Sequence, residues 1–263
     1  MKYDISFIGA GNMGSALLTA AAKTGKALAL TDVAEAKGKA LAAKFGAAFV
    51  GPEELARESR VVFLAVKPHI IEGVCEALRG QFAPETLLVT MAAGKTLAEI
   101  SAAAGTDRVI RIMPNTPVAV GKGMTVYVPG AGVEKEDEAL FLEAMAYAGI
   151  TDRIDERNID AAMALSGCGP AYAYQFAEAL ADGAVACGLP RDKANLYAAA
   201  TLAGAAQMLL ESGSHPGALK DAVCSPGGTT IQGVRALEAR GFRSAAMEAV
   251  IAAYEKTLAL AGK

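Results

Sequence analysis

The stretch that decides the fold is Ile5-Ser6-Phe7-Ile8-Gly9-Ala10-Gly11-Asn12-Met13-Gly14. An apolar run suited to a buried strand leads into the glycines, and residues 12–23 then follow a helical pattern. A GxGxxG sequence between a strand and a helix indicates a dinucleotide-binding turn, although an ordinary glycine-rich turn would share the pattern. Gly9 permits the tight turn, Gly11 lets a pyrophosphate approach the backbone, and Gly14 lets the helix pack on the strand.

Strands and helices alternate through the first 155 residues. After 5–8 we expect strands at 27–31, 47–50, 60–66, 86–90 and 108–112, an edge strand at 126–128, and helices such as 12–23 and 34–45. This alternation predicts a parallel sheet covered by helices on both faces, which is a Rossmann-type α/β domain. Ligands bind such sheets at the carboxyl ends of the strands.

The pattern changes after residue 155. Long segments rich in Ala and Leu follow at 171–187, 192–211, 229–240 and 243–261, separated by Gly, Pro and Ser. They predict an all-helical domain, so we divide the chain into domains 1–155 and 156–263. Several of these helices look apolar over more than one face, and a second copy of the chain would bury those faces.

Composition narrows the classes of function. The 263 residues are 53% hydrophobic with a net charge of −3, so the chain fills a core but lacks the basic surface that nucleic acid requires. The N-terminus does not resemble a secretory leader, and the uncharged stretch 194–210 suits a helix buried on several sides better than a membrane span. The spacing of the four cysteines suits neither a metal nor a redox pair, so we expect buried free thiols, no metal and a cytoplasmic protein.

Asp32 follows the second expected strand. An acid at this position hydrogen-bonds the adenosine ribose hydroxyls, and it favours NADH because it repels the 2′-phosphate of NADPH. Lys37 and Lys39 are the nearest cations and would partly offset that repulsion. The alternative is that Asp32 caps the following helix.

Three other strand ends carry candidate cofactor residues: Ala65-Val66-Lys67-Pro68, Met91-Ala92-Ala93 and Asn115. Small residues at 92–93 let a nicotinamide ribose approach, and Asn115 offers a polar side chain between two prolines. Lys67 is equally suited to be a solvated surface lysine. Pro68 is expected to begin a helix.

The helical half contains the segment Ser225-Pro226-Gly227-Gly228-Thr229-Thr230, which opens a helix. Free backbone N–H groups and hydroxyls at a helix start bind a carboxylate well. The alternative is simple helix capping by Ser225 or Thr229. The two histidines, His69 and His215, are interpreted as surface or capping residues rather than bases.

Five motifs follow one another along the chain: GAGNMG at 9–14, AVKP at 65–68, RIMPNTP at 111–117, SGCGPAY at 166–172 and VCSPGGTT at 223–230. Together they resemble the Δ1-pyrroline-5-carboxylate reductase family over nearly the whole chain. The resemblance implies reduction of 1-pyrroline-5-carboxylate to L-proline, the last step of proline biosynthesis, with NADPH or NADH. It also implies a Rossmann domain followed by an all-α dimerisation domain of the 6-phosphogluconate-dehydrogenase-like C-terminal type, in a homodimer or a ring of dimers.

The resemblance also implies roles for individual residues. Cofactor contacts fall on Ile8 to Met13, Ala65 to Pro68 and Met91 to Ala93, and the substrate pocket on Ser225, Gly227, Gly228, Thr229 and Thr230. We expect the Thr230 hydroxyl to hydrogen-bond the ring nitrogen, since a protonated imine needs no strong acid–base pair. Cys168 and Asp32 depart from the family, whose members commonly have Ser at the first position and, when they prefer NADPH, a small polar residue at the second.

Two other classes of protein compete with this interpretation. A β-hydroxyacid dehydrogenase has a similar two-domain build but needs a catalytic lysine on a helix, and residues 170–186 contain none. A dinucleotide-binding sensor without turnover would not need the Ser225–Thr230 segment.

Overall fold

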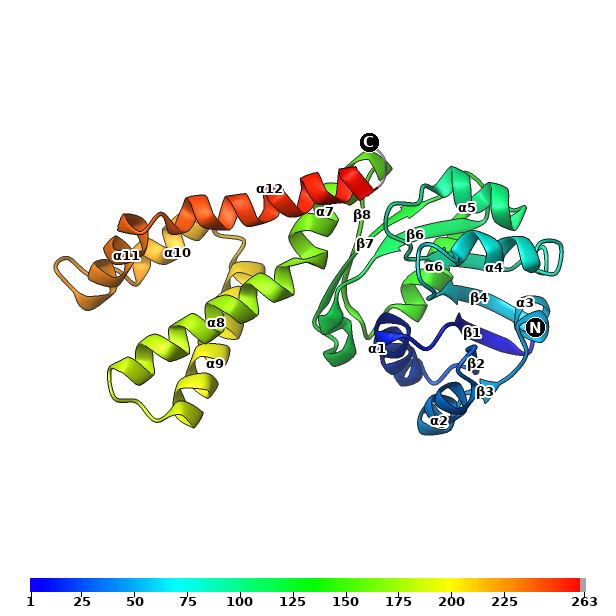
Figure 1. The fold of residues 1–263 in the computed structure, drawn as a ribbon, viewed down its shortest axis with the longest axis horizontal. Helices are drawn as coiled ribbons and strands as arrows, with labels where there is room; N and C mark the ends of the chain where they lie inside the picture. The colour runs from blue at the N-terminus through cyan, green and yellow to red at the C-terminus, as the bar shows by residue number, and fades with distance from the viewer. Residues whose placement is uncertain (261–263) are drawn as a thin grey trace. The chain divides into compact units, whose positions relative to one another are not determined.

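The computed structural model describes residues 1–260 (Figure 1). Two compact units are present. Among the described residues, the sheet unit comprises 1–168 and 253–260, and the helical unit comprises 169–252. The expected class, an α/β domain followed by an all-α domain, is confirmed.

The sheet unit contains one eight-stranded sheet in the order β3-β2-β1-β4-β5-β6-β7-β8. The strands are β1 (Tyr3–Ile8), β2 (Leu28–Thr31), β3 (Ala48–Phe49), β4 (Ser59–Leu64), β5 (Leu87–Thr90), β6 (Val109–Met113), β7 (Gly123–Pro129) and β8 (Gly149–Arg153). β1 to β6 are parallel, and the strand order reverses at β1, which lies between β2 and β4. This reversal opens a crevice at the carboxyl ends of β1 and β4.

The end of the sheet differs from the expectation. β7 is antiparallel to β6, with Arg111 opposite Val128, and it is an interior strand rather than an edge. The edge is β8, which pairs in parallel with β7 and was not predicted. Its sequence, Gly-Ile-Thr-Asp-Arg, has a single large apolar residue and lacks the buried alternation that marks a strand.

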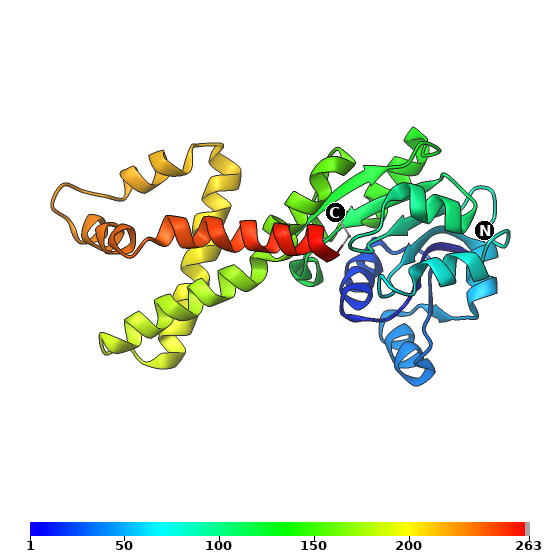
Figure 2. The same cartoon turned by 45° about the horizontal axis from the view of Figure 1, so that its top comes forward.

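Helices cover both faces of the sheet (Figures 1 and 2). One face carries α1 (Asn12–Ala21), α2 (Glu35–Phe45) and α6 (Lys135–Ala144), and the other carries α3 (Pro52–Glu58), α4 (Ile71–Ala77) and α5 (Leu97–Ala104). Successive strand residues point to opposite faces of the sheet. The rings of Phe7 and Phe63 stack on the face that carries α1, with their centres 4.9 Å apart, while Ile8 packs on the face that carries α4. Pro68 was expected to begin a helix, but α4 begins three residues later, at Ile71.

A second short region of the sheet unit follows β8. It contains α7 (Ile159–Ala162) and a π-helical turn (Met163–Gly167), neither of which was predicted. Arg111 on β6 is buried. Its guanidinium nitrogens lie 3.0 Å from Glu156 Oε1 and 3.5 Å from Asp160 Oδ1. The Asn115 side chain donates to Ser166 O and accepts from Met124 N, both at 2.9 Å. These buried polar contacts attach residues 156–168 to the sheet.

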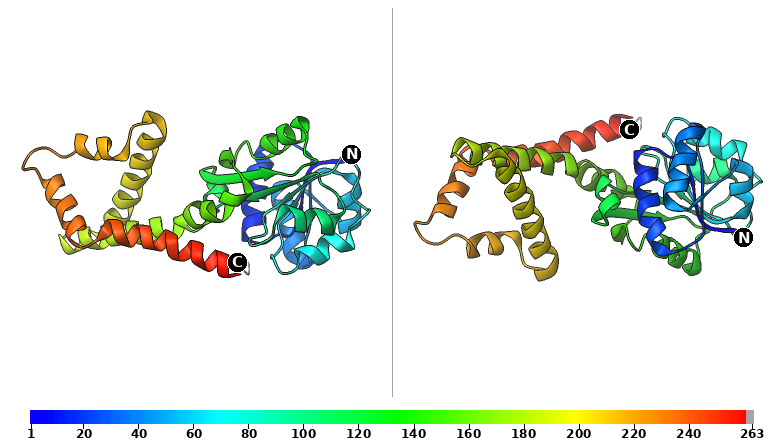
Figure 3. Two further views of the ribbon diagram at one scale, coloured as in Figure 1. Left: turned by 90° about the horizontal axis from the view of Figure 1, so that it is seen from above. Right: turned by 90° about the horizontal axis from the view of Figure 1, so that it is seen from below.

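The helical unit contains α8 (Gly169–Ala186), α9 (Arg191–Ser212), α10 (Pro216–Ala222), α11 (Thr229–Ala239) and most of α12 (Phe242–Leu260). α8 and α9 form a hairpin (Figure 3) around a small core of Ala181, Ala194 and Ala198. α8 also contacts α12, because Tyr172 Oη donates to Ala249 O at 3.1 Å. α10 was not predicted, since its residues begin with the Pro and Gly that mark a turn.

Within a single chain α9 is buried along one side only, and burial of its other sides by a second copy stays a prediction. Only Ala194 and Ala198 are buried, whereas Leu196, Tyr197 and Leu210 are each more than half exposed within this chain. Across residues 1–260, no helix combines the length and apolarity that a membrane crossing requires.

Candidate cofactor and substrate sites

The glycine turn between β1 and α1 has the geometry that the sequence predicts. Gly9 has φ +107°, and a Cβ atom there would lie 2.5 Å from Ala65 O. A Cβ at Gly14 would lie 2.5 Å from Gly9 O, so α1 approaches the turn too closely for any side chain. At Gly11 a Cβ would meet nothing within 4 Å. The turn is therefore packed against protein at Gly9 and Gly14 and open at Gly11, where a ligand has room to approach.

An open groove of about 550 Å³ lies along this turn at the carboxyl ends of the strands. Its lining contains these predicted cofactor residues: Gly9, Gly11, Asn12, Met13, Asp32, Ala65, Val66, Lys67 and Met91. The other lining residues are Val33, Ile70, Met113, Pro114 and Thr116. The last three belong to the motif at 111–117, whose Thr116 is expected to present a polar group at the crevice, whereas the sequence did not single out Val33 or Ile70. Val33, Met113 and Pro114 lie within three residues of a predicted strand end, so position relative to the strands is a signal that identifies them.

A second, apolar pocket of about 240 Å³ adjoins the groove. Its lining consists of Ile8, Gly9, Thr31, Asp32, Val33, Pro52, Glu53, Val66, Ile70, Val74, Ala77 and Leu78. Apart from Gly9, the residues that line both cavities are Asp32, Val33, Val66 and Ile70, and Asp32 has the one polar side chain among them. The apolar walls suit a flat aromatic base, and the groove suits a phosphate group at the helix N-terminus.

Asp32 itself is fixed by two backbone hydrogen bonds. Its Oδ2 accepts from Ala10 N, and its Oδ1 accepts from Ala34 N at 2.7 Å. The N-cap residue of α2 is Ala34 rather than Asp32, and no side chain caps that helix. The carboxylate therefore links β2 to the glycine turn while one side of Asp32 remains open to both cavities.

The remaining predicted cofactor residues do not line the groove. Ala10, Gly14, Ala92 and Asn115 are buried. Ala92 packs in the core, and both polar atoms of Asn115 are occupied by Ser166 and Met124. Pro68 and Ala93 are half-buried beside the loops that follow β4 and β5. Asn115 shapes its loop from inside the protein.

The predicted substrate segment is a tight turn in the helical unit. Gly228 N donates to Ser225 O at 3.0 Å, Pro226 and Gly227 occupy the middle of the turn, and Gly227 has φ +69°. A proline followed by a glycine with positive φ is typical of a type II turn. α11 begins at Thr229 with Gly228 as its N-cap residue, and no side chain caps it. Simple capping by Ser225 or Thr229 is therefore wrong.

The start of α11 consequently presents unshielded polar groups. The first N–H groups of a helix have no partner within the helix, and no side-chain cap takes their place here. Ser225, Thr229 and Thr230 are exposed. Hydroxyls and backbone N–H groups thus gather at one point, which suits a small carboxylate.

Comparison with known proteins shows the same organisation. The chain is 43% identical over 263 residues to the pyrroline-5-carboxylate reductase of Escherichia coli, covering 98% of both chains. This chain belongs to the pyrroline-5-carboxylate reductase family. The structures of the family members from Coxiella burnetii and, with NADP bound, Plasmodium falciparum superpose with TM-scores of 0.90 and 0.87 at 32% identity, covering 99% of each chain.

Family models divide the reductase in two. The model described as pyrroline-5-carboxylate reductase dimerisation matches residues 156–260, and the model described as NADP oxidoreductase coenzyme F420-dependent matches residues 4–94. The glycine turn lies within the second match and Ser225–Thr230 within the first. The chain is therefore an NAD(P)H-dependent oxidoreductase by family, with a dimerisation domain.

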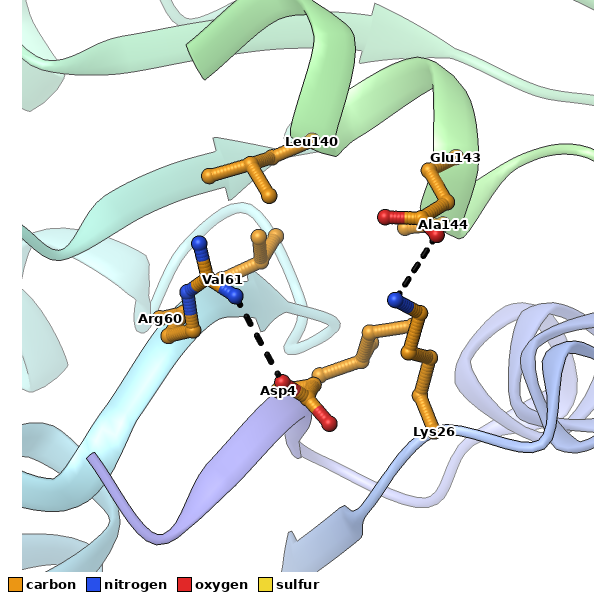
Figure 4. Close-up of a pocket in the computed structure, with 8 residues that line it drawn as sticks. Asp4, Lys26, Arg60, Val61, Leu140, Glu143 and Ala144 are labelled. Carbon is orange, nitrogen blue, oxygen red and sulfur yellow. Dashed lines mark ion pairs between the residues drawn. The ribbon is translucent and has the colours of Figure 1, made fainter. Parts of the chain in front are cut away.

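Other polar groups of the reductase lie away from these sites. Asp4 pairs with Arg60, and Lys26 pairs with Glu143, around a hollow of about 10 Å³ at the amino ends of the strands (Figure 4). That volume holds one water at most. His215 Nδ1 accepts from Gly217 N and caps α10, as expected for a capping histidine.

The cysteines only partly match the expectation of buried thiols. All four are free, but Cys75 alone is buried, Cys168 and Cys224 are half-buried, and Cys187 is exposed. Burial raises the pKa of Cys75 to about 11. Among the described residues, no group of three or more His, Cys, Asp or Glu side chains is arranged to hold a metal ion.

Proposed function

We propose that this chain reduces 1-pyrroline-5-carboxylate to L-proline with NADH or NADPH, the last step of proline biosynthesis. The observation that carries the proposal is the uncapped start of α11 after the Ser225–Gly228 turn, in a chain of this family. When bound, the reduced nicotinamide supplies the hydride that converts the C=N bond to an amine. The glycine turn and the groove beside it fit a dinucleotide, since an open face at Gly11 meets the start of α1.

The substrate end of this proposal rests on the first turn of α11. The N–H groups at Thr229 and Thr230, which have no partner within the helix, bind the substrate carboxylate, and Ser225 adds a hydroxyl. Gly227 and Gly228 keep the turn tight, since a Cβ at Gly228 would collide with Ser225 Oγ. The Thr230 hydroxyl hydrogen-bonds the ring nitrogen. A protonated imine is already electrophilic, so positioning is the main task of these residues.

The cofactor end uses the predicted strand-end residues in two ways. Direct contacts come from Gly9, Gly11, Asn12, Met13, Asp32, Ala65, Val66, Lys67 and Met91, with Ile8 in the wall of the apolar pocket. Ala10, Gly14, Pro68, Ala92, Ala93 and Asn115 shape the surrounding backbone. Backbone N–H groups at Gly11 to Met13 receive the pyrophosphate, since the N–H of Ala10 donates to Asp32.

Turnover is tested by following loss of absorbance of NADH and of NADPH with pyrroline-5-carboxylate, and by identifying proline as the product. Thr230→Ala removes the hydroxyl, and we expect kcat/KM to fall by about tenfold or more because one positioned donor is lost. Thr230→Ser keeps the hydroxyl and serves as the matched control, with a smaller loss. If Thr230→Ala retains kcat/KM within about threefold of the parent enzyme, the role of Thr230 is wrong. No oxidation of either cofactor would favour a dinucleotide sensor.

The proposal extends to domains, assembly and location. The functional boundary lies at 155/156, which the start of the dimerisation match supports. The chain forms a homodimer, or a ring of dimers, through the exposed apolar residues of its helical unit. Its free thiols fit the reducing cytoplasm.

A further inference from the structure

The adenosine end of the cofactor site contains two acids. Asp32 lines both the groove and the apolar pocket, and Glu53 lines the pocket. None of the residues that line the pocket, all of them within the described range 1–260, is a lysine or an arginine. A ribose that joins a base in the pocket to a pyrophosphate in the groove must pass Asp32, the polar side chain that the two cavities share.

None of the nearby cations Lys37, Lys39 and Lys67 lines the pocket. Lys39 lies 2.6 Å from Glu35 on α2, and its ammonium also lies 5.9 Å from the centre of the Phe49 ring. The pairing with Lys39 lowers the pKa of Glu35, which stays charged. Lys67 lines the groove but not the pocket. These lysines therefore supply no binding group at the wall of the pocket. The positive charge of Lys39, which was expected to reduce the repulsion of a 2′-phosphate, pairs with Glu35 instead.

We infer that Asp32 and Glu53 make NADH the preferred cofactor of this reductase. This inference rests on the proposed function of the site. The ribose hydroxyls of NADH donate to the Asp32 carboxylate, whose two oxygens each have a second lone pair beyond the bonds from Ala10 and Ala34. The 2′-phosphate of NADPH brings about two negative charges to the same place, where both carboxylates repel it.

The two bonds to Ala10 N and Ala34 N give Asp32 a structural role as well. A purely structural role acts on the glycine turn, which binds the part that both cofactors share. Losing a purely structural role would weaken the binding of NADH and of NADPH by the same factor. A role in discrimination changes the ratio of the two dissociation constants, so this ratio separates the two roles.

The test measures binding of NADH and NADPH to the full-length protein by fluorescence titration, without substrate. We expect the parent protein to bind NADH about tenfold or more tightly than NADPH. Asp32→Asn keeps the shape and one acceptor, and it should bring the two dissociation constants within about threefold of each other. Glu53→Gln should shift the ratio by about twofold, because Glu53 is exposed. Glu58→Gln is the matched control, since Glu58 is exposed on the same helix but lines neither cavity, and it should leave the ratio unchanged.

A second arm replaces the whole cofactor by adenosine 2′,5′-bisphosphate and by AMP. Both probes occupy only the adenosine end, so a preference for AMP places the discrimination there. The preference should shrink at high salt, because the Debye length falls from about 10 Å at 0.1 M to about 3 Å at 1 M.

Three outcomes would overturn the inference: NADPH binding as tightly as NADH, equal weakening of both cofactors by Asp32→Asn, or a preference that salt leaves unchanged. Turnover assays on the same protein separate this from the proposed function. Binding preference without proline formation contradicts the proposed function alone, and proline formation without a preference contradicts this inference alone.

Discussion

The sheet unit and the helical unit bury their apolar residues in different ways. Phe7, Phe63 and Phe141 are almost completely buried in the sheet unit, between the sheet and the helices that cover it. The helical unit buries only alanines in its own core, and it leaves Leu210 63% and Met247 59% exposed. One unit completes a core within the chain, whereas the other needs a further surface to cover it.

One set of ion pairs from each unit shows a similar contrast in solvent exposure. Arg111 and Asp160 are buried in the sheet unit and their partner Glu156 is half-buried, whereas Arg191 and Asp182 of the helical unit are half-exposed or more. Removing one partner of a buried pair leaves a charge in a poorly solvated place, but water replaces a lost exposed partner. The comparison therefore predicts unequal costs for equivalent substitutions.

The largest effect is expected from Arg111→Met. We expect the free energy of unfolding to fall by about 3–5 kcal/mol, because the substitution leaves Glu156 and Asp160 without the guanidinium. Arg191→Met is the matched control in the helical unit and should cost about 0–1 kcal/mol. Chemical denaturation followed by circular dichroism measures both. Equal costs would contradict the distinction between the units.

A smaller effect is expected from Leu210→Glu, which places a carboxylate on the exposed apolar face. We expect self-association to weaken about hundredfold, because burying the unpaired charge costs about 3 kcal/mol. Leu142→Glu on α6, at a residue exposed in the sheet unit, should leave association unchanged. Sedimentation velocity gives both results. A parent protein that stays a folded monomer at about micromolar concentration would remove the basis of the prediction.

The smallest effect concerns thiol chemistry. Cys187 in the helical unit should react with iodoacetamide at about pH 8 within minutes, whereas Cys75 should stay unmodified, since its buried thiol has a pKa near 11. The raised pKa of Cys75 also makes the stability of the fold depend on pH. It leaves stability unaffected below the pKa of the unfolded thiol and lowers stability as pH rises from there toward about 11. Mass spectrometry of the labelled peptides checks the order, and faster labelling of Cys75 than of Cys187 would contradict it.

Local patterns made most of the sheet unit predictable. The apolar run before Gly9 predicts the strand β1, and the glycine that follows it predicts a turn with positive φ, so both features could be inferred from a few neighbouring residues. β8 could not be found this way, because its strand conformation comes from pairing with β7 rather than from its own composition. The same limit explains the wrong edge assignment for 126–128.

The candidate sites were predictable to a similar degree. The position of Asp32 after a strand identified it, but its bond to Ala10 N depends on contact between distant segments. Asn115 was interpreted as a polar group facing a ligand, and its burial arises from Ser166, 51 positions away. Glu53 had no sequence signal, because its importance comes only from the pocket that it shares with Asp32.

The long helix α12 has a consequence for how the chain is made. It begins in the helical unit and ends in the sheet unit, where Thr257 is 5% exposed. The helical unit is thus an insertion, attached to the sheet unit by the chain at both of its ends. During synthesis residues 253–260 leave the ribosome after the helical unit, so the sheet unit gains the last turns of α12 only after every residue of the helical unit has been added. A single proteolytic cut between α9 and α10 would leave each fragment carrying part of the sheet unit.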